Sequence, residues 1–368
     1  MTVPDSGNLL QDGIAHHRAG RADAAADCYR RILEAEPENA DALHLIGVLS
    51  LQAADWDVAA EYIEHAIAIS ETAPAFHDHL AVVRRNQGRL KDAETEHRRA
   101  LELDPGFASA YNNLATTLRQ DGRTAEAVRA ALKAMETAPN DPVIAQNAGI
   151  LFMEAEAFAR AAVAFGQAAS ANPESATLRE KQGIALFRTG QLDAAEAAFR
   201  EAVRLGATGL NARRWLIETL LVLERVEEAA VAARELADSC PDDARIQALY
   251  GVAAMRAGET DAAAAACERA LAADAGHVPA IVGLAVIAAA KGDTRGAVRR
   301  YREVLVLDPD NVDAYGNLAA FGEDGLTNAD AEKIAGLFGW QALAEDLRAT
   351  LAFALAHYLR RVGEREAA

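Results

Sequence analysis

Aromatic residues, cysteine and lysine are scarce in this sequence of 368 residues, and each shortage narrows what it can encode. Only 5% of the residues are aromatic although 51% are hydrophobic, so alanine supplies much of the apolar content, which favours closely packed helices. Strand signals are nearly absent. The three cysteines, Cys28, Cys240 and Cys267, cannot all pair with one another, which argues against a disulfide framework and favours a reducing compartment.

Runs of basic residues and long apolar segments are also missing. The net charge is -18, and the 37 basic residues are interspersed with 55 acidic ones, so we expect neither nucleic acid nor an anionic membrane as the main partner. The first ten residues, MTVPDSGNLL, show no export signal. The longest apolar run, 279–290, is well short of the ~20 residues that a membrane span needs, so we expect a cytoplasmic protein.

Motifs for catalysis and cofactor binding are lacking as well. None of the five lysines follows glycine as in a phosphate-binding loop, and no Gly-x-Gly-x-x-Gly motif follows a strand. Pairs of acidic residues lie beside arginine on expected helix surfaces, where a solvated ion pair is the ordinary interpretation. The sequence therefore predicts no enzyme, no catalytic residue and no cofactor.

What the sequence does contain is a unit of 34 residues, repeated nine times without insertion or deletion. The twentieth residue of every unit is alanine, and the eighth is small in eight of the nine units. The units begin at Ser6, Ala40, Pro74, Ala108, Pro142, Ala176, Leu210, Ala244 and Val278.

Each unit has the pattern of two helices. In the unit at Ala108, Leu114 and Leu118 have helical spacing, Gly122 interrupts, and a second helical pattern ends at Pro139. Glycine recurs at this break in six units, because a helix that ends there needs a residue tolerant of positive φ. Small residues at the eighth and twentieth positions let the two helices approach closely. We therefore predict an all-α solenoid, with a tail over 1–5, nine repeats over 6–309 and a helical extension over 310–368.

These features resemble the tetratricopeptide repeat (TPR) family, a helix-turn-helix motif of the same length. The resemblance is carried by stretches such as YNNLATTLRQDGRTAEAVRAALKAMETAP and LHLIGVLSLQAADWDVAAEYIEHAIAI, and it covers Ser6 to Pro309 and parts of the tail. The family implies a right-handed superhelix whose first helices line a concave groove that binds peptides or partner proteins. It does not imply an enzyme.

The resemblance also assigns groove positions, of which the ninth is aliphatic in seven of nine units. An exposed aliphatic stripe would invite a peptide with regularly placed hydrophobic residues, whereas superhelical curvature could instead press it against neighbouring helices. The candidate groove residues are Ile14, Val48, Val82, Arg85, Asn112, Asn113, Thr116, Arg119, Asn147, Ile150, Met153, Ile184 and Phe187.

Two groove chemistries of similar proteins can be compared with these residues. Chaperone-binding modules of the family hold a terminal carboxylate with Lys at the fifth and Asn at the ninth position, and that clamp is absent here. The repeat arms of O-linked sugar transferases stack Asn at the sixth position, which this chain matches only at Asn113, Asn147 and Asn317. Backbone gripping near the fourth and fifth units is one interpretation, and ordinary solvated asparagines are the other.

One histidine-rich stretch is a candidate metal site. His77, Asp78 and His79, together with His44 one unit earlier, offer imidazole and carboxylate ligands. Residues two apart on a helix point to different faces, so His77 and His79 cannot easily share one ion. We therefore predict no metal site and a core role for His77.

The seventh unit departs from the pattern. It carries Ile217 and Leu236 where other units are mostly small, and the glycine-containing segment 206–209 precedes it. Two interpretations stay open, namely a local widening or change of curvature between the sixth and seventh units, and mutual compensation within a normal stack.

The tail begins as a tenth repeat and then leaves the motif. Residues 312–320 predict another first helix, and Thr327 or Asn328 is expected to cap a short helix through Phe338. With Gly363 as a turn, the chain would end where another second helix begins. Either the last helix folds back as a cap, or a C-terminal partner is missing.

Two functional classes follow from this tail. The first is a non-catalytic interaction scaffold that binds a protein or peptide in its groove. The second is the recognition arm of a larger sulfotransferase or O-linked glycosyltransferase, since LTNADAEKIAGLFG and LRATLAFALAHYLRRVGEREAA resemble the junction before the sulfotransferase domain of some bacterial repeat proteins. Self-association through the C-terminal end is a third, weaker prediction.

Overall fold

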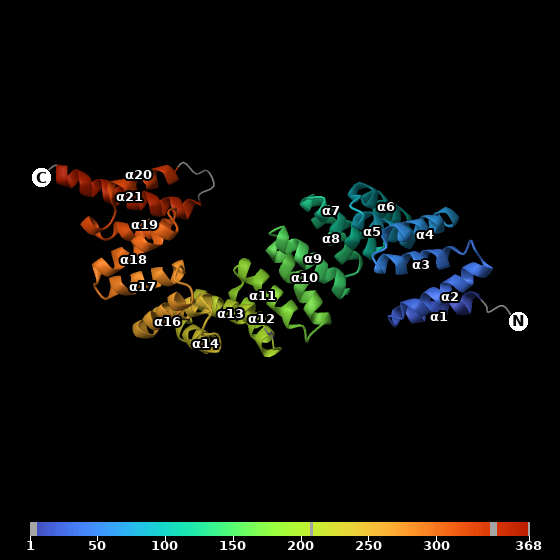
Figure 1. Cartoon of the computed structure of the whole chain (residues 1–368), viewed down its shortest axis with the longest axis horizontal. Helices are drawn as coiled ribbons and strands as arrows, with labels where there is room; N and C mark the ends of the chain where they lie inside the picture. The colour runs from blue at the N-terminus through green and yellow to red at the C-terminus, as the bar shows by residue number, and fades with distance from the viewer. Residues whose placement is uncertain (1–5, 207–208, 339–343, 367–368) are drawn as a thin grey trace. The chain divides into compact units, whose positions relative to one another are not determined.

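The fold is all-α, as the sequence predicts, in a computed structural model that describes residues 6–206, 209–338 and 344–366 (Figure 1). The described residues form helices and contain no strand. The chain divides into two compact units, Met1–Gly206 and Ala207–Ala368. Among the described residues, no helix combines the length and the apolar content that a membrane crossing requires.

The described residues of the first unit form twelve helices, which pair in chain order into antiparallel hairpins that stack on one another, the α-solenoid arrangement. Their bounds are α1 Ser6–Arg18, α2 Ala22–Ala35, α3 Ala40–Gln52, α4 Trp56–Ile69, α5 Pro74–Asn86, α6 Leu90–Leu103, α7 Ala108–Gln120, α8 Thr124–Thr137, α9 Pro142–Glu154, α10 Phe158–Ala171, α11 Ala176–Arg188 and α12 Leu192–Arg204.

The second unit continues the same hairpins and then ends differently. Its hairpins are α13 Leu210–Val222 with α14 Val226–Ser239, α15 Ala244–Arg256 with α16 Thr260–Ala273, and α17 Val278–Ala290 with α18 Thr294–Leu307. The tail consists of α19 Val312–Ala319, a short 3-10 turn over Gly322–Asp324, α20 Asn328–Leu337 and α21 Glu345–Glu366.

The turn inside every hairpin has one residue in the left-handed region, as the glycine pattern predicts. Six of these residues are glycines, with φ between 70° and 79°. In the other three hairpins Ala54, Glu156 and Glu224 adopt φ of 61°, 54° and 59°. A residue with a side chain is strained in this conformation, so the repeat imposes the turn even where the residue type opposes it.

The same repeat positions form the core of the hairpin from repeat to repeat. The alanine at the twentieth position has an exposed fraction of 0% in all nine repeats. The small residue at the eighth position lies under the side chain at the twenty-fourth: a Cβ on Gly149 would stand 2.7 Å from the Phe165 ring, and one on Gly183 would stand 2.6 Å from the Phe199 ring. The eighth position is therefore small mainly to admit this large side chain, whereas the sequence had indicated the twentieth position as its partner.

The seventh repeat inverts this arrangement within its own hairpin. Ile217 at the eighth position and Leu236 are each about 1% exposed, and Ala233 occupies the twenty-fourth position in the same core cluster. A large residue at one position is thus matched by a small one at the other. The predicted change of curvature before this repeat falls on residues 207–208, which lie outside the described residues, and it stays a prediction.

The C-terminal extension agrees with the sequence in its first helices and departs from it in the last. Thr327 caps α20 in a capping box with Asp330, close to the predicted start. The predicted turn at Gly363 is wrong, because α21 runs through it without interruption. A single glycine costs a helix only about 1 kcal/mol, and here Leu351, Ala354 and Tyr358 of α21 are buried in the same cluster as Leu318 of α19. The last helix thus folds back and covers α19.

Candidate functional site

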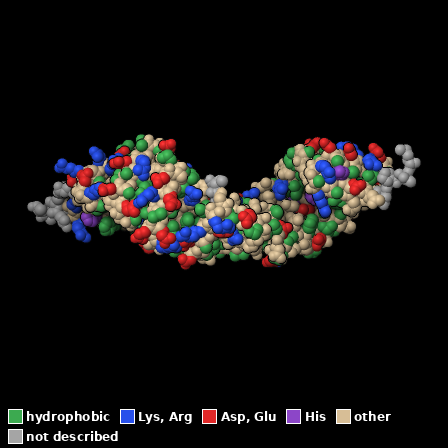
Figure 2. Space-filling view, turned by 90° about the horizontal axis from the view of Figure 1, so that it is seen from below, with side chains coloured by type: hydrophobic (Ala, Val, Ile, Leu, Met, Phe, Trp, Pro, Cys, Tyr) green, Lys and Arg blue, Asp and Glu red, His purple; other side chains and the backbone are tan. Residues whose placement is uncertain are grey.

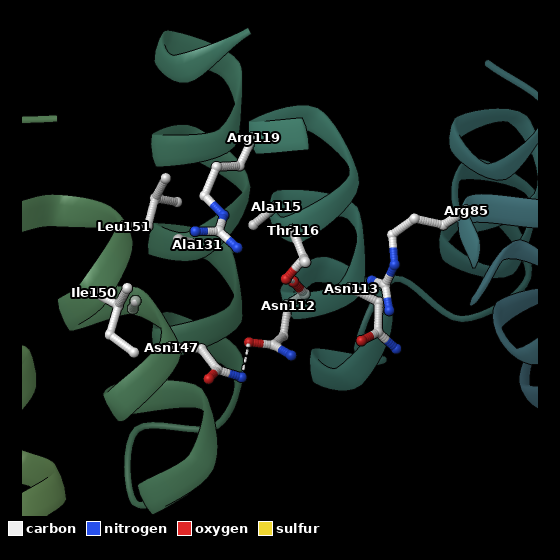
Figure 3. Close-up of a pocket in the computed structure, with 11 residues that line it drawn as sticks. Arg85, Asn112, Asn113, Ala115, Thr116, Arg119, Ala131, Asn147, Ile150 and Leu151 are labelled. Atoms are coloured by element: carbon white, nitrogen blue, oxygen red, sulfur yellow. Dashed lines mark hydrogen bonds between the residues drawn. The ribbon is translucent and has the colours of Figure 1, made fainter. Parts of the chain in front are cut away.

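A pocket of about 280 Å³ opens between α5, α7 and α9 of the first unit (Figure 3). These are the first helices of three successive hairpins, and the first helix of each hairpin is called its inner helix below. Seven of the thirteen predicted groove residues line it together. They are Arg85, Asn112, Asn113, Thr116, Arg119, Asn147 and Ile150, and the remaining lining residues are Ala115, Ala131, Ala148 and Leu151.

Two asparagines from successive repeats are joined across the pocket. The Asn147 side-chain amide donates to Asn112 Oδ1 at 3.2 Å, as the dashed line in Figure 3 marks. This bond uses one N–H of Asn147 and the oxygen of Asn112. It therefore leaves the Asn112 Nδ2 group as a donor and Asn147 Oδ1 as an acceptor, which is the pair of functions that a peptide unit matches.

The third asparagine connects the pocket to the buried core. Asn113 Nδ2 donates to Asp78 Oδ2 at 2.9 Å, and His97 Nδ1 lies 2.8 Å from Asp78 Oδ1. Asp78 and His97 are both buried, with exposed fractions of 3% and 0%. Both carboxylate oxygens of Asp78 are thus occupied, and they fix the orientation of the Asn113 amide.

The two arginines of the pocket differ in their partners. Arg119 Nη1 donates to Glu154 Oε1 at 2.7 Å. Arg85 is half-buried, and its guanidinium makes no hydrogen bond or ion pair within the described residues. Burial lowers the pKa of Arg85, Asp78 raises it and Arg119 lowers it. An arginine remains protonated even so, which makes Arg85 a cation without a direct counter-ion in the pocket.

The side-chain contacts between neighbouring inner helices follow one rule of register. Asn147 with Asn112, Asp78 with Asn113, Arg119 with Glu154 and His44 with His79 are each separated by 35 residues. A residue at one position of a repeat therefore contacts the residue one position further along in the following repeat. A spacing of 35 residues therefore predicts which residues of successive repeats are in contact. A prediction made for each groove position separately does not use this spacing.

The pocket exists where the fourth repeat is small at two facing positions. Ala115 occupies the eighth position and Ala131 the twenty-fourth, where other repeats of the first unit place Tyr29, Ile63, Phe165 or Phe199. Both alanines line the pocket. Sequence reasoning missed them because it searched the groove positions and left the core positions out.

The other six predicted groove residues do not join this pocket. Ile14, Val48, Val82, Met153, Ile184 and Phe187 are all half-buried. The aliphatic stripe of the first unit is therefore neither fully exposed nor fully covered, and both interpretations stay predictions.

The histidine-rich stretch is distributed over two different environments. His77 is buried and contacts Glu96 Oε2 at 2.7 Å and the Glu71 carbonyl at 3.1 Å. His79 points elsewhere and lies 2.8 Å from His44, which stacks on Phe76 with a centroid distance of 4.3 Å. In the described part of the chain no three His, Cys, Asp or Glu residues are arranged to hold a metal ion.

Charged side chains are mixed in sign, as the sequence predicts. On the face drawn in Figure 2, acidic and basic side chains are interspersed over the described residues of each unit. Many charged side chains of the described residues pair within one helix at a spacing of three or four residues, such as Arg204 with Glu201. Exposed pairs of this kind contribute little to binding or stability.

Comparison with known families identifies the repeats. One family model described as a tetratricopeptide repeat matches residues 10–74, 80–142, 147–209 and 216–278, and a second with the same description matches 254–320. The chain belongs to the tetratricopeptide repeat family. Its repeats are of the kind that serves as a protein–protein interaction scaffold.

Several solved structures are similar to parts of the chain. A thermophilic TPR protein of Thermus thermophilus is 20% identical, with a TM-score of 0.44, and the match covers 50% of this chain and 100% of that one. YrrB, described as a TPR protein with an unusual peptide-binding site, is 21% identical over 51% of this chain and 96% of its own, with a TM-score of 0.42.

An O-GlcNAc transferase of Thermobaculum terrenum is 26% identical over 36% of this chain and 26% of its own, with a TM-score of 0.35. No curated protein matches the sequence.

Proposed function

We propose that the protein is a non-catalytic scaffold whose first unit binds an extended peptide segment of a partner protein, at the pocket between α5, α7 and α9. The observation that carries the proposal is the convergence of Asn112, Asn113 and Asn147 with Arg85 in one cavity. A cavity of about 280 Å³ has room for a side chain and adjoining backbone, since one water takes about 30 Å³ of liquid volume.

The asparagines would hold the main chain of the peptide. Asn112 Nδ2 donates to a peptide carbonyl and Asn147 Oδ1 accepts from a peptide N–H, because their mutual hydrogen bond leaves these two groups available. Amide-to-backbone hydrogen bonds are independent of the peptide's side chains, so they give affinity for an extended conformation and little selectivity.

The half-buried aliphatic residues beside the pocket would contact the peptide's side chains. Ile150 lines the pocket, and Ile184 occupies the same position in the next repeat. Partial burial holds these side chains in place and leaves part of their apolar surface for a ligand. The other predicted groove residues, from Ile14 to Phe187, extend the proposed inner face along the first unit.

A display library of short degenerate peptides tests the proposal. Peptides selected by the full chain are synthesised with a fluorophore, and their affinities are measured by anisotropy. Asn112→Ala with Asn147→Ala should weaken binding by about thirtyfold, the effect of losing two hydrogen bonds worth about 1 kcal/mol each. Ile150→Glu and Ile184→Glu should weaken it further. Val163→Glu is the matched control, because Val163 is 60% exposed on α10 outside the pocket. Unchanged affinity in the pocket variants would contradict the proposal.

A second candidate function is the recognition arm of a larger transferase. Asn113 and Asn147, the sixth-position asparagines of successive repeats, both line the pocket, an arrangement that suits a peptide substrate as well as a partner protein. Reading the gene beyond Ala368 tests it, because a transferase domain in the same frame would favour the arm. A cytoplasmic location and the division into 1–5, 6–309 and 310–368 belong to the same proposal.

A further inference from the structure

We infer that Arg85 reads an acidic residue of the peptide, so that the first unit selects segments carrying Asp or Glu beside the stretch held by the asparagines. The inference rests on the proposed function and adds the chemical class of the ligand. It concerns a residue at the twelfth repeat position, where Arg85 supplies a guanidinium to the pocket.

The charge balance of the pocket is the first argument. The whole chain carries a net charge of -18, yet the eleven lining residues that the structure describes include two arginines and no Asp or Glu. Glu154 neutralises Arg119 at 2.7 Å. The unbalanced charge at the pocket is therefore that of Arg85, and a ligand that enters it meets a donor-rich, positively charged wall.

The second argument is that, among the described residues, no neighbouring carboxylate takes the place of the ligand. Asp78 is the acid that acts on Arg85 electrostatically. Its two oxygens are bound at 2.8 Å by His97 and at 2.9 Å by Asn113, and it is buried beneath the pocket wall. Asp78 thus acts on the charge of Arg85 without a hydrogen bond to it, and the guanidinium N–H groups stay available to a ligand.

Position gives the third argument. In Figure 3 the Arg85 guanidinium points toward Asn113, on the opposite side of Asn112 from Asn147. A peptide held by Asn112 and Asn147 would therefore extend toward Arg85. A planar guanidinium binds a carboxylate through two parallel hydrogen bonds, and partial burial strengthens such a pair relative to open water.

The test compares residue preferences selected by the full-length protein and two variants. The same degenerate library is selected with the wild type, with Arg85→Gln and with Arg160→Gln. Arg160 is exposed on α10, so its removal changes the net charge equally without touching the pocket. We expect Asp and Glu to be enriched at one peptide position by the wild type and by Arg160→Gln, and we expect this enrichment to be lost with Arg85→Gln.

Titration then measures the size of the effect. A selected peptide and its Glu-to-Gln counterpart should differ by about tenfold in affinity for the wild type, the usual value of a hydrogen bond to a charged group. They should bind Arg85→Gln equally. Arg85→Lys should retain part of the difference, because it keeps the charge and loses the fork. Added salt should reduce the difference, since screening weakens the ion pair.

Failure of this inference and failure of the proposed function give different results. Equal binding of the Glu and Gln peptides to the wild type, or an acidic preference that survives Arg85→Gln, overturns the role of Arg85 while peptide binding stands. Selection of no peptide overturns both.

Asn112→Ala should weaken both peptides by the same factor, which separates backbone holding from charge reading. Binding of free succinate as tight as that of the peptide would overturn the assignment to a peptide side chain. Circular dichroism melting of Arg85→Gln checks that the fold is intact.

Discussion

The inner helices of the two units share one backbone plan and carry different chemistry. In the first unit the fourth and fifth repeats present Asn112, Asn113 and Asn147 around a pocket. In the second unit Val252 and Val286, at the repeat position of Thr116 and Ile150, are 44% and 39% exposed. The alanines at the twentieth position are nevertheless fully buried in both units. The positions that build the hairpin are thus separate from those that set its surface, and each set can change without the other.

The largest effect expected at neutral pH tests whether a change in the core of one unit leaves the core of the other unit intact. Gly183→Val should lower the free energy of unfolding by about 2 to 3 kcal/mol, because its side chain must displace the buried Phe199 ring. Hydrogen exchange should rise around α11 and α12 and change little in α15 to α18, since stacked repeats depend mainly on their neighbours. Ala115→Val is the control, where Ala131 replaces the ring, and it should cost about 1 kcal/mol or less. Equal costs would contradict this account of the core.

Acid is expected to affect the first unit more than the second. Burial, and next the neighbouring His79, lower the pKa of His44 to about 3. The unfolded chain binds this proton below the ordinary value of 6.5, whereas the folded chain does not, so the stabilising contribution is complete above pH 6.5 and is lost as the pH falls toward 3. Within that window the loss is about 1.4 kcal/mol per pH unit.

Urea denaturation across this pH range measures the effect. His44→Leu should make the dependence on pH shallower. His357→Leu, which changes an exposed histidine of α21 in the second unit, should leave it unchanged. A slope that is the same in both variants would show that the pKa of His44 is not lowered in the folded chain.

A smaller effect is expected at the hairpin turns, which occur in both units. Ala54→Gly and Glu156→Gly in the first unit, and Glu224→Gly in the second, should each raise the free energy of unfolding by about 0.5 to 1 kcal/mol, because glycine relieves the left-handed strain at some entropic cost. Ala53→Gly, one residue earlier at φ of -78°, should lower it instead. Thermal melts of the four variants are sufficient, and a gain at Ala53 would refute the strain argument.

The smallest expected effect tests the difference in surface chemistry. Val252→Glu with Val286→Glu should leave the affinity of the selected peptides unchanged within about twofold, because neither residue lines the pocket of the first unit. The anisotropy titration used for the first unit measures it. A clear loss of affinity would mean that the ligand also contacts the inner face of the second unit.

Self-association through the C-terminal end also stays a prediction. Because α21 covers α19, the tenth first helix does have a partner within the chain. Light scattering across a range of concentrations tests whether two copies associate nonetheless.

Register accounts for most of what the sequence predicts correctly. The period of 34 residues places every hairpin, and it carries the turn through Ala54, Glu156 and Glu224 even though these residues disfavour it. The groove positions that the family resemblance implies include seven of the residues that line the pocket.

Contacts between positions are what the sequence alone did not supply. Two of these contacts depend on how the helices of a hairpin face each other. The first is the side chain that lies over Gly183, and the second is the cavity that Ala115 and Ala131 leave. The error at Gly363 has another cause. Beyond the last complete repeat no period of 34 residues guides the prediction, and the glycine alone indicated a turn. The buried residues Leu351, Ala354 and Tyr358 instead keep α21 helical.

The pocket draws its wall from three consecutive modules, and this has a consequence for the evolution of the array. Each repeat of a stack contacts only its neighbours, so a duplication elsewhere in the stack would preserve both the fold and the pocket. Excision of the module that contains α7 would bring α5 beside α9, and the remaining hairpins could still close on one another. Such a shortened chain would keep Arg85 and lose Asn112 together with Asn113, so it would keep the fold and lose two of the three asparagines of the pocket.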